Sequence, residues 1–161
     1  MIVVSDTSPL NYLVLIDAID LLPRLFGEVY VPPAVIEELA HSRTPDVVKE
    51  WIQSSPAWLR IQPPAADHRF TDGLGPGETA AIALAIELGA SAVLIDEKAG
   101  RRIAKAQGLA TLGTITVLEL GAEQQLIDLN AAIVALSQTT FHITDELLDA
   151  ALARDAARKR G

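Results

Sequence analysis

The sequence predicts an α/β layered fold with a mainly parallel central sheet. Short apolar runs alternate along the chain with amphipathic segments of helical period, which is typical of this class. The runs at residues 1–4 and 92–95 are rich in valine, isoleucine and leucine, as expected of strands that a parallel sheet buries on both faces. Glycines follow the segments 78–88 and 98–107, where a helix would end. The 161 residues suit one domain over residues 1–161, and the chain shows no internal repeat.

The same patterns place the individual elements. We expect strands at residues 1–4, 28–31, 58–61, 92–95 and 109–112. We expect helices at 8–15, 17–26 (interrupted near Pro23), 33–40, 44–52, 78–88, 98–107, 114–120, 127–136 and 144–158, the last with Leu147, Leu148, Ala151 and Leu152 facing inward. Proline and glycine at residues 63–77 predict a mobile surface loop, and the helices from about residue 125 should pack on the rest of the domain.

Composition excludes some classes of protein. The net charge is −8, whereas proteins that bind nucleic acids widely and without specificity are basic overall. The absence of cysteine excludes disulfides, thiolate metal sites and cysteine nucleophiles, and it suits a reducing cytoplasm. No apolar run reaches the roughly 18–20 residues that span a bilayer, and we find no pattern of a signal peptide. We therefore expect a cytoplasmic protein without a membrane segment.

Two acids follow apolar strands. Asp6 comes after the first strand, and Asp96 comes after the strand at 92–95. Ligands of open α/β sheets bind beyond the carboxyl ends of the strands, so these two carboxylates are expected to converge. Each could instead cap the helix that follows it. Glu97 is adjacent to Asp96 and should point elsewhere, most simply to solvent.

Two further acids lie on predicted helices. Glu78 shares an apolar face with Ile82 and Ala85, all within about 60° on a helical wheel, and an unpaired charge is costly there. The alternative is an exposed acid at a helix start, which the helix dipole favours. Glu37 and Glu38 flank the apolar centre of their helix at equal angles, so the wheel does not choose between them.

Carboxylates gathered in a partly buried place repel one another unless they are protonated or a cation lies among them. Oxygen-rich clusters suit Mg²⁺ or Mn²⁺, which activate water and stabilise displacement at phosphorus. The helix after Asp96 also carries a cationic stripe, which could bind a nucleic-acid backbone or could be an ordinary solvated face. The stripe consists of Lys98, Arg101, Arg102 and Lys105.

Four segments carry distinctive motifs: VSDTSPL at residues 4–10, VPPAVIEEL at 31–39, LGPGETAAIALA at 74–85 and LIDE at 94–97. In this order, over roughly residues 1–127 and with Gly113-Thr114 further on, they resemble the PIN-domain family, in a prokaryotic branch close to the VapC-type toxin nucleases. The resemblance implies a three-layer α/β/α domain with an acidic pocket that binds Mg²⁺ or Mn²⁺.

The resemblance also implies roles for residues. By position, the four acids that bind metal and act in catalysis are Asp6, Glu38, Glu78 and Asp96. Glu78 stands where an aspartate is commoner, and its extra methylene would change the distance to the metal. Thr7, Ser8 and Thr114 match hydrogen-bonding neighbours, and Arg101 matches a basic position. From the cationic stripe, we expect Lys98, Arg101 or Arg102 to position the backbone of the substrate.

We therefore expect a metal-dependent endoribonuclease that hydrolyses RNA phosphodiester bonds, as the toxin of a toxin–antitoxin pair with a cognate antitoxin protein as partner. The apolar content of 50% indicates a homodimer. One alternative is a non-catalytic regulatory module that binds metal or RNA. Another is a phosphatase with Asp6 as nucleophile, which Ser8 disfavours because an acid would be expected two residues after that aspartate.

Overall fold

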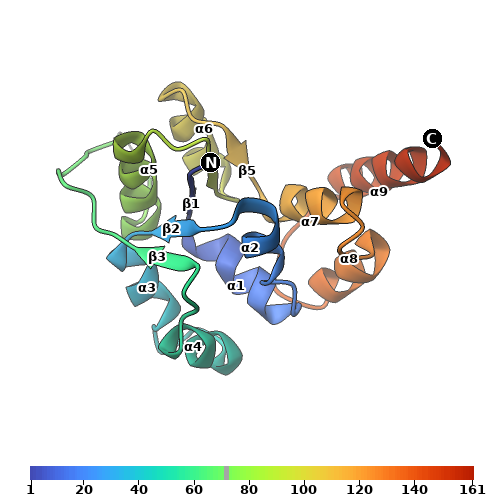
Figure 1. Ribbon diagram of the computed structural model, residues 1–161, viewed down its shortest axis with the longest axis horizontal. Coiled ribbons are helices and arrows are strands. Elements are labelled where there is room, and N and C mark those ends of the chain that lie inside the picture. Colours follow the sequence, from blue (N-terminus) through green and yellow to red (C-terminus); the bar gives the residue numbers. More distant parts are fainter. Residues whose placement is uncertain (71–72) are drawn as a thin grey trace.

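The computed structural model describes residues 1–70 and 73–161. In this part of the chain, a five-stranded parallel sheet has the order β3-β2-β1-β4-β5 (Figure 1). Its strands are β1 (Val3–Ser5), β2 (Val29–Val31), β3 (Leu59–Ile61), β4 (Ala92–Leu94) and β5 (Thr111–Leu112). The parallel pairing confirms the predicted class of sheet.

The register of the central strands brings their carboxyl ends to one edge of the sheet. Val3 of β1 aligns with Val29 of β2 on one side and with Ala92 of β4 on the other. The backbone N–H of Asp6 continues this pairing by donating to the carbonyl of Leu94 over 2.9 Å. The residues that follow β1 and β4 therefore lie side by side, although about ninety positions separate them in the sequence.

Helices cover both faces of the sheet, which makes the predicted three layers. The described helices are α1 (Thr7–Leu15), α2 (Leu21–Phe26), α3 (Pro33–Leu39), α4 (Asp46–Gln53), α5 (Pro76–Leu88), α6 (Lys98–Ala106), α7 (Thr114–Glu123), α8 (Leu129–Ser137) and α9 (Asp145–Arg160). Alternate residues of β1 face opposite layers, as the pleat of a strand requires. Val3 packs in a cluster with α1, α2, α3, α4, α7 and α8, whereas Val4 packs with α5 and α6.

The prediction of an interrupted helix at residues 17–26 is wrong in two respects. Asp17 has a positive φ of 59°, so residues 17–20 form turns, and α2 begins only at Leu21. Pro23 does not interrupt this helix, because it lies in the first turn, where backbone N–H groups have no partner within the helix.

The loop predicted at residues 63–77 contains no strand among its described residues. It ends where α5 begins at Pro76, and its residues 71–72 lie outside the described residues.

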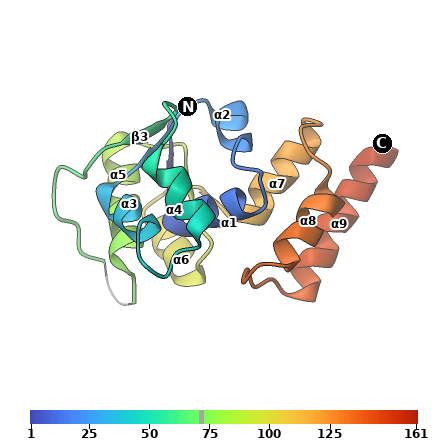
Figure 2. The same ribbon diagram turned by 90° about the horizontal axis from the view of Figure 1, so that it is seen from below.

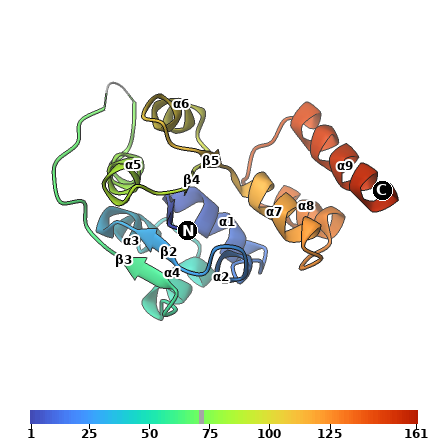
Figure 3. The same ribbon diagram turned by 45° about the horizontal axis from the view of Figure 1, so that its top comes forward.

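The last three helices gather at one end of the molecule (Figures 2 and 3). Helix α9 packs against α7 and α8, and Arg154 pairs with Glu119 of α7 over 2.8 Å. The buried stripe of α9 is narrower than predicted, because Leu147 is 59% exposed rather than inward. Ala151 is buried as predicted. None of the described helices has the length and apolar character needed to cross a membrane.

Candidate active site

Asp6 lies at the point where the central strand ends. It occupies the residue before α1, yet its side chain makes no capping hydrogen bond to that helix. Only 3% of Asp6 is exposed, and its Oδ1 atom is buried without a hydrogen-bond partner. Burial raises the pKa of Asp6 to about 7, with an opposing contribution from the backbone N–H of Thr7. Nearby carboxylates also act to raise it, namely Glu78, Glu38 and Asp96.

Helix α3 contributes Glu38, and the structure decides between the two glutamates that the helical wheel left open. Glu37 is exposed, whereas Glu38 accepts hydrogen bonds from the Thr7 hydroxyl and, over 3.2 Å, from the backbone N–H of Gly77. A Cβ atom at Gly77 would overlap the Glu38 carboxylate, with its Cδ atom only 2.7 Å away. Glycine at this position therefore lets α5 start directly against the acid of α3.

Glu78 lies in the first turn of α5 and is half-buried. One oxygen, Oε1, accepts a 3.4 Å hydrogen bond from the backbone N–H of Gly75, while Oε2 is buried without a partner. Burial is the main cause that raises the pKa of Glu78; the N–H of Gly75 opposes it, and the charges of Glu97 and Glu38 add to it. Glu78 can thus hold the start of α5 through Oε1 while its Oε2 is available to a cation in the cavity.

Asp96 is held by three hydrogen bonds. Its Oδ1 accepts from the backbone N–H of Thr114 over 2.7 Å, and its Oδ2 accepts from the hydroxyls of Thr114 at 2.7 Å and Ser8 at 2.9 Å. Thr114 is the first residue of α7, so Asp96 caps that helix and not the one that follows it in sequence. These bonds tie the end of β4 to the starts of α1 and α7.

The adjacent Glu97 was predicted to point elsewhere, most simply to solvent; it is exposed as predicted, but it also borders the acid cavity. Glu97 lines the same cavity as Asp6, Glu38 and Glu78, whereas Asp96 is not among its lining residues. The reason is tertiary: donors at both sides of Asp96 draw its side chain toward α7, so the next side chain faces the acids. No feature of the sequence alone distinguishes these two neighbours.

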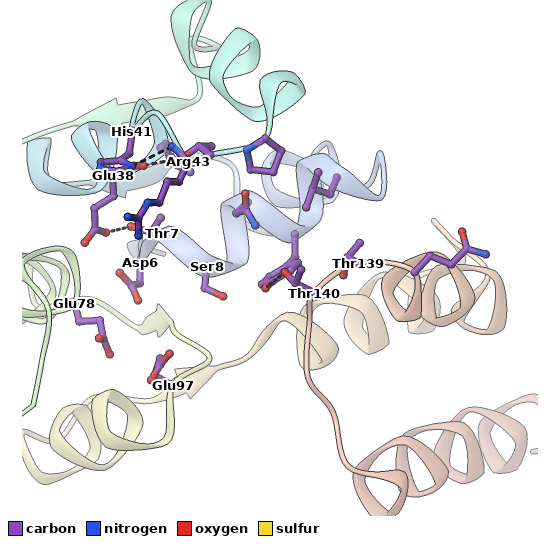
Figure 4. A pocket seen from close by; sticks show the side chains of 17 residues that line it. Asp6, Thr7, Ser8, Glu38, His41, Arg43, Glu78, Glu97, Thr139 and Thr140 are labelled. Carbon is purple, nitrogen blue, oxygen red and sulfur yellow. Dashed lines mark hydrogen bonds between the residues drawn. The ribbon is translucent and has the colours of Figure 1, made fainter.

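The cavity has a volume of about 870 Å³, and Figure 4 shows the acids gathered at one end of it. From there it continues along α1 to the linker between α8 and α9. Its lining residues are Asp6, Thr7, Ser8, Asn11, Tyr12, Leu15, Glu38, Leu39, His41, Arg43, Thr44, Pro45, Glu78, Glu97, Gln138, Thr139 and Thr140. Sequence reasoning missed His41 and Arg43, although their position directly after the helix of Glu38 is a signal that could have found them.

The predicted cationic stripe lies outside this cavity. Lys98, Arg102 and Lys105 are exposed on α6. Arg101 is half-buried and borders a separate cavity of about 170 Å³, together with Asp96 and residues of the α8–α9 linker. None of the four cations lines the large cavity among the described residues.

The fold and the site together define an α/β protein with an acid-lined cavity at the carboxyl edge of a parallel sheet. The chain belongs to the PIN-domain family, because residues 2–156 match a family model described as a PIN domain, DUF3368. PIN domains are usually nucleases, and they generally use divalent metals.

Structural comparison agrees with this assignment. A PilT N-terminus domain protein, SSO1118, from the hyperthermophilic archaeon Sulfolobus solfataricus P2 aligns with a TM-score of 0.52. The alignment covers 89% of this chain and 100% of that chain at 13% sequence identity, so it shows a shared fold. A search of curated proteins gives no significant match.

Proposed function

We propose that the chain is a divalent-metal-dependent endoribonuclease that hydrolyses RNA phosphodiester bonds. One observation carries this proposal. Asp6 and Glu78 line the same cavity, and each has a buried carboxylate oxygen without a hydrogen-bond partner among the described residues. An isolated buried carboxylate is costly, and a cation beside it removes that cost. Membership of a family of nucleases supports the same reading.

The available donors fit Mg²⁺ or Mn²⁺, because carboxylate and hydroxyl oxygens are the ligands that these hard cations prefer. In residues 1–70 and 73–161, no three acidic or histidine side chains already form a group that could hold an ion. Mg²⁺ needs only one or two carboxylates, since it keeps several of its waters. We therefore assign the ion to Asp6 and Glu78, with Glu38 and Glu97 as further acceptors at the same cavity.

When bound, the ion would lower the pKa of a water molecule and stabilise the charge that develops at phosphorus. The side chains around it have separate tasks. Asp6 must lose its proton to hold a cation, and its raised pKa means that binding releases a proton near neutral pH. Thr7 holds the Glu38 carboxylate in place, and Asp96 is a positioning residue that acts through Ser8 and Thr114.

The proposal is tested by RNA cleavage with Mg²⁺ or Mn²⁺. We expect the wild-type chain to cleave, and we expect Asp6→Asn to abolish cleavage because a neutral amide cannot balance the cation. Glu37→Gln is the matched control, since Glu37 is exposed beside Glu38 and should be dispensable. Cleavage that persists in a chelator, or equal cleavage by wild type and Asp6→Asn, would contradict the proposal.

A second candidate is a regulatory module that binds RNA without turnover. The net charge of −8 favours it, as does Glu78 at a position where the family more often has aspartate. Calorimetric titration with Mn²⁺ separates the two candidates. Binding that requires Asp6 and Glu78 supports the nuclease, and no binding at millimolar Mn²⁺ supports the module.

The biological setting is proposed from the resemblance to VapC-type nucleases. We propose that the chain is the toxin of a toxin–antitoxin pair, acts in the cytoplasm and forms a homodimer. We expect a small antitoxin gene beside this one, and we expect its co-expressed product to block RNA cleavage. Light scattering coupled to gel filtration tests the homodimer by its mass.

A further inference from the structure

We propose that Gly100 of α6 is a positioning residue for Glu78 and keeps the partnerless oxygen of this acid in place. The role rests on the proposed function, because it concerns how one of the acids meets a cation. The longer side chain of a glutamate extends into space that a side chain at residue 100 would fill. Glu78 and Gly100 are thus a pair of residues that match in size.

The backbone of Gly100 lies directly against the Glu78 carboxylate. A Cβ atom at Gly100 would lie 2.7 Å from Glu78 Oε2, closer than Cβ atoms come to their neighbours in proteins. Oε2 is also the oxygen that is buried without a hydrogen-bond partner among the described residues. The other oxygen, Oε1, accepts from the backbone N–H of Gly75 over 3.4 Å. The carboxylate is therefore located by a hydrogen bond at one oxygen and by the bare backbone of α6 at the other.

Nothing within α6 itself requires glycine at this position. Gly100 is the third residue of the helix and is buried, as is Ala104 one turn later. Its φ is not positive, so its backbone conformation is open to any residue. Alanine would favour the helix, because glycine in a helix interior is destabilising relative to alanine. The reason for glycine therefore lies in the close approach of side chains from outside α6.

Two side chains make this approach. Besides Glu78 Oε2, the Cδ1 atom of Ile95 would lie 2.5 Å from a Cβ atom at Gly100. Both atoms are the ends of flexible side chains, so the fold can accept alanine if these ends turn aside. Ile95 belongs to an apolar cluster, whereas Glu78 lines the cavity. Turning Glu78 aside would move the oxygens that a cation binds.

A small movement of this carboxylate is sufficient to matter. Mg²⁺ demands near-octahedral geometry with oxygens at about 2.0–2.1 Å. Changes to the partners that orient a metal ligand typically cost about 10–100-fold in metal affinity. An aspartate at residue 78 is one methylene shorter and would end about 1.5 Å further from Gly100. The clash with an alanine at residue 100 should then be relieved, which gives the proposal its test.

Thermal unfolding of the full chain with chelator present tests the contact without a metal. The shift in midpoint caused by Gly100→Ala should be more favourable in the Glu78→Asp background than in the wild type, by at least about 2 °C. The reason is that only the glutamate reaches the added methyl group. Equal shifts in the two backgrounds would overturn the proposal.

Calorimetric titration with Mn²⁺ tests the position of the carboxylate. Gly100→Ala should weaken Mn²⁺ binding about tenfold in the wild type. The same substitution should change binding less than twofold in the Glu78→Asp background. Gly121→Ala is the matched control, because a Cβ atom at this buried glycine of α7 would lie 2.9 Å from Leu21 and near no acid. It should leave Mn²⁺ affinity unchanged.

Ile95→Val separates the position of Glu78 from the packing of α6, because it removes the Cδ1 atom. The loss of Mn²⁺ affinity in Gly100→Ala should persist in this background. Affinity that Ile95→Val restores would assign Gly100 to packing alone and overturn the proposal, as would unchanged affinity in Gly100→Ala. Unequal midpoint shifts, together with no Mn²⁺ binding by the wild type, would uphold the match of Glu78 with Gly100 and refute the proposed function.

Discussion

Replacing Asp6 by asparagine should make the metal-free protein more stable at alkaline pH. The buried carboxyl group has a pKa of about 7 in the folded chain, compared with about 3.9 for an aspartate in an unfolded chain. The folded state therefore holds a proton that the unfolded state has lost. Stability must fall as pH rises from about 4 to about 7, because the proton is bound more tightly in the native state.

The magnitude follows from the difference in pKa. About 3 pKa units at 1.36 kcal/mol each give a penalty of up to about 4 kcal/mol above pH 7. Asparagine has the shape of the neutral acid and carries no charge. Asp6→Asn should thus exceed the wild type by up to about 4 kcal/mol in free energy of unfolding at pH 8, and by about 0.5 kcal/mol or less near pH 4.

Urea unfolding at pH 4, 6 and 8 in the presence of a chelator measures this difference. Asp149→Asn, at an exposed aspartate of α9, is the matched control and should follow the wild type at each pH. Mn²⁺ added at pH 8 should stabilise the wild type and leave Asp6→Asn unchanged, because a ligand stabilises only the form that binds it. A variant that is equally or less stable than the wild type at pH 8 would refute the electrostatic account of Asp6.

The remaining predictions concern the neighbours of Asp6. Asp96→Asn should lower the free energy of unfolding by about 1–3 kcal/mol, because the NH₂ group of asparagine cannot accept a hydrogen bond that Ser8 or Thr114 donates to the carboxylate. Glu97→Gln should leave the free energy of unfolding unchanged but weaken Mn²⁺ binding in calorimetry. Reduced stability with unchanged Mn²⁺ binding would instead assign the ligand role to Asp96. Gly77→Ala should displace the Glu38 carboxylate and weaken Mn²⁺ binding, with circular dichroism reporting that the fold is retained. An unchanged affinity would show that Glu38 is not needed for the ion.

Local patterns in the sequence were sufficient for the fold. Apolar runs of strand length alternate with amphipathic segments, and each of these signals depends on residues within one element. The placement of Asp6 at a strand end follows from the same local order, the helical wheel singled out Glu78, and the family motifs chose Glu38 over Glu37. The error at residues 17–26 has a local cause as well, because the apolar spacing continued across a turn that Asp17 forms with a positive φ.

The choice between adjacent side chains was decided by tertiary structure. Whether Asp96 or Glu97 faces the cavity depends on hydrogen-bond donors at Ser8 and Thr114, which are 88 and 18 residues away from Asp96. The burial that raises the pKa of Asp6 likewise exists only once α1, α3 and α5 are packed around the sheet edge. The sequence alone pointed to three of the carboxylates that line the cavity, namely Asp6, Glu38 and Glu78. The raised pKa of Asp6 and that of Glu78 follow from contacts between distant segments.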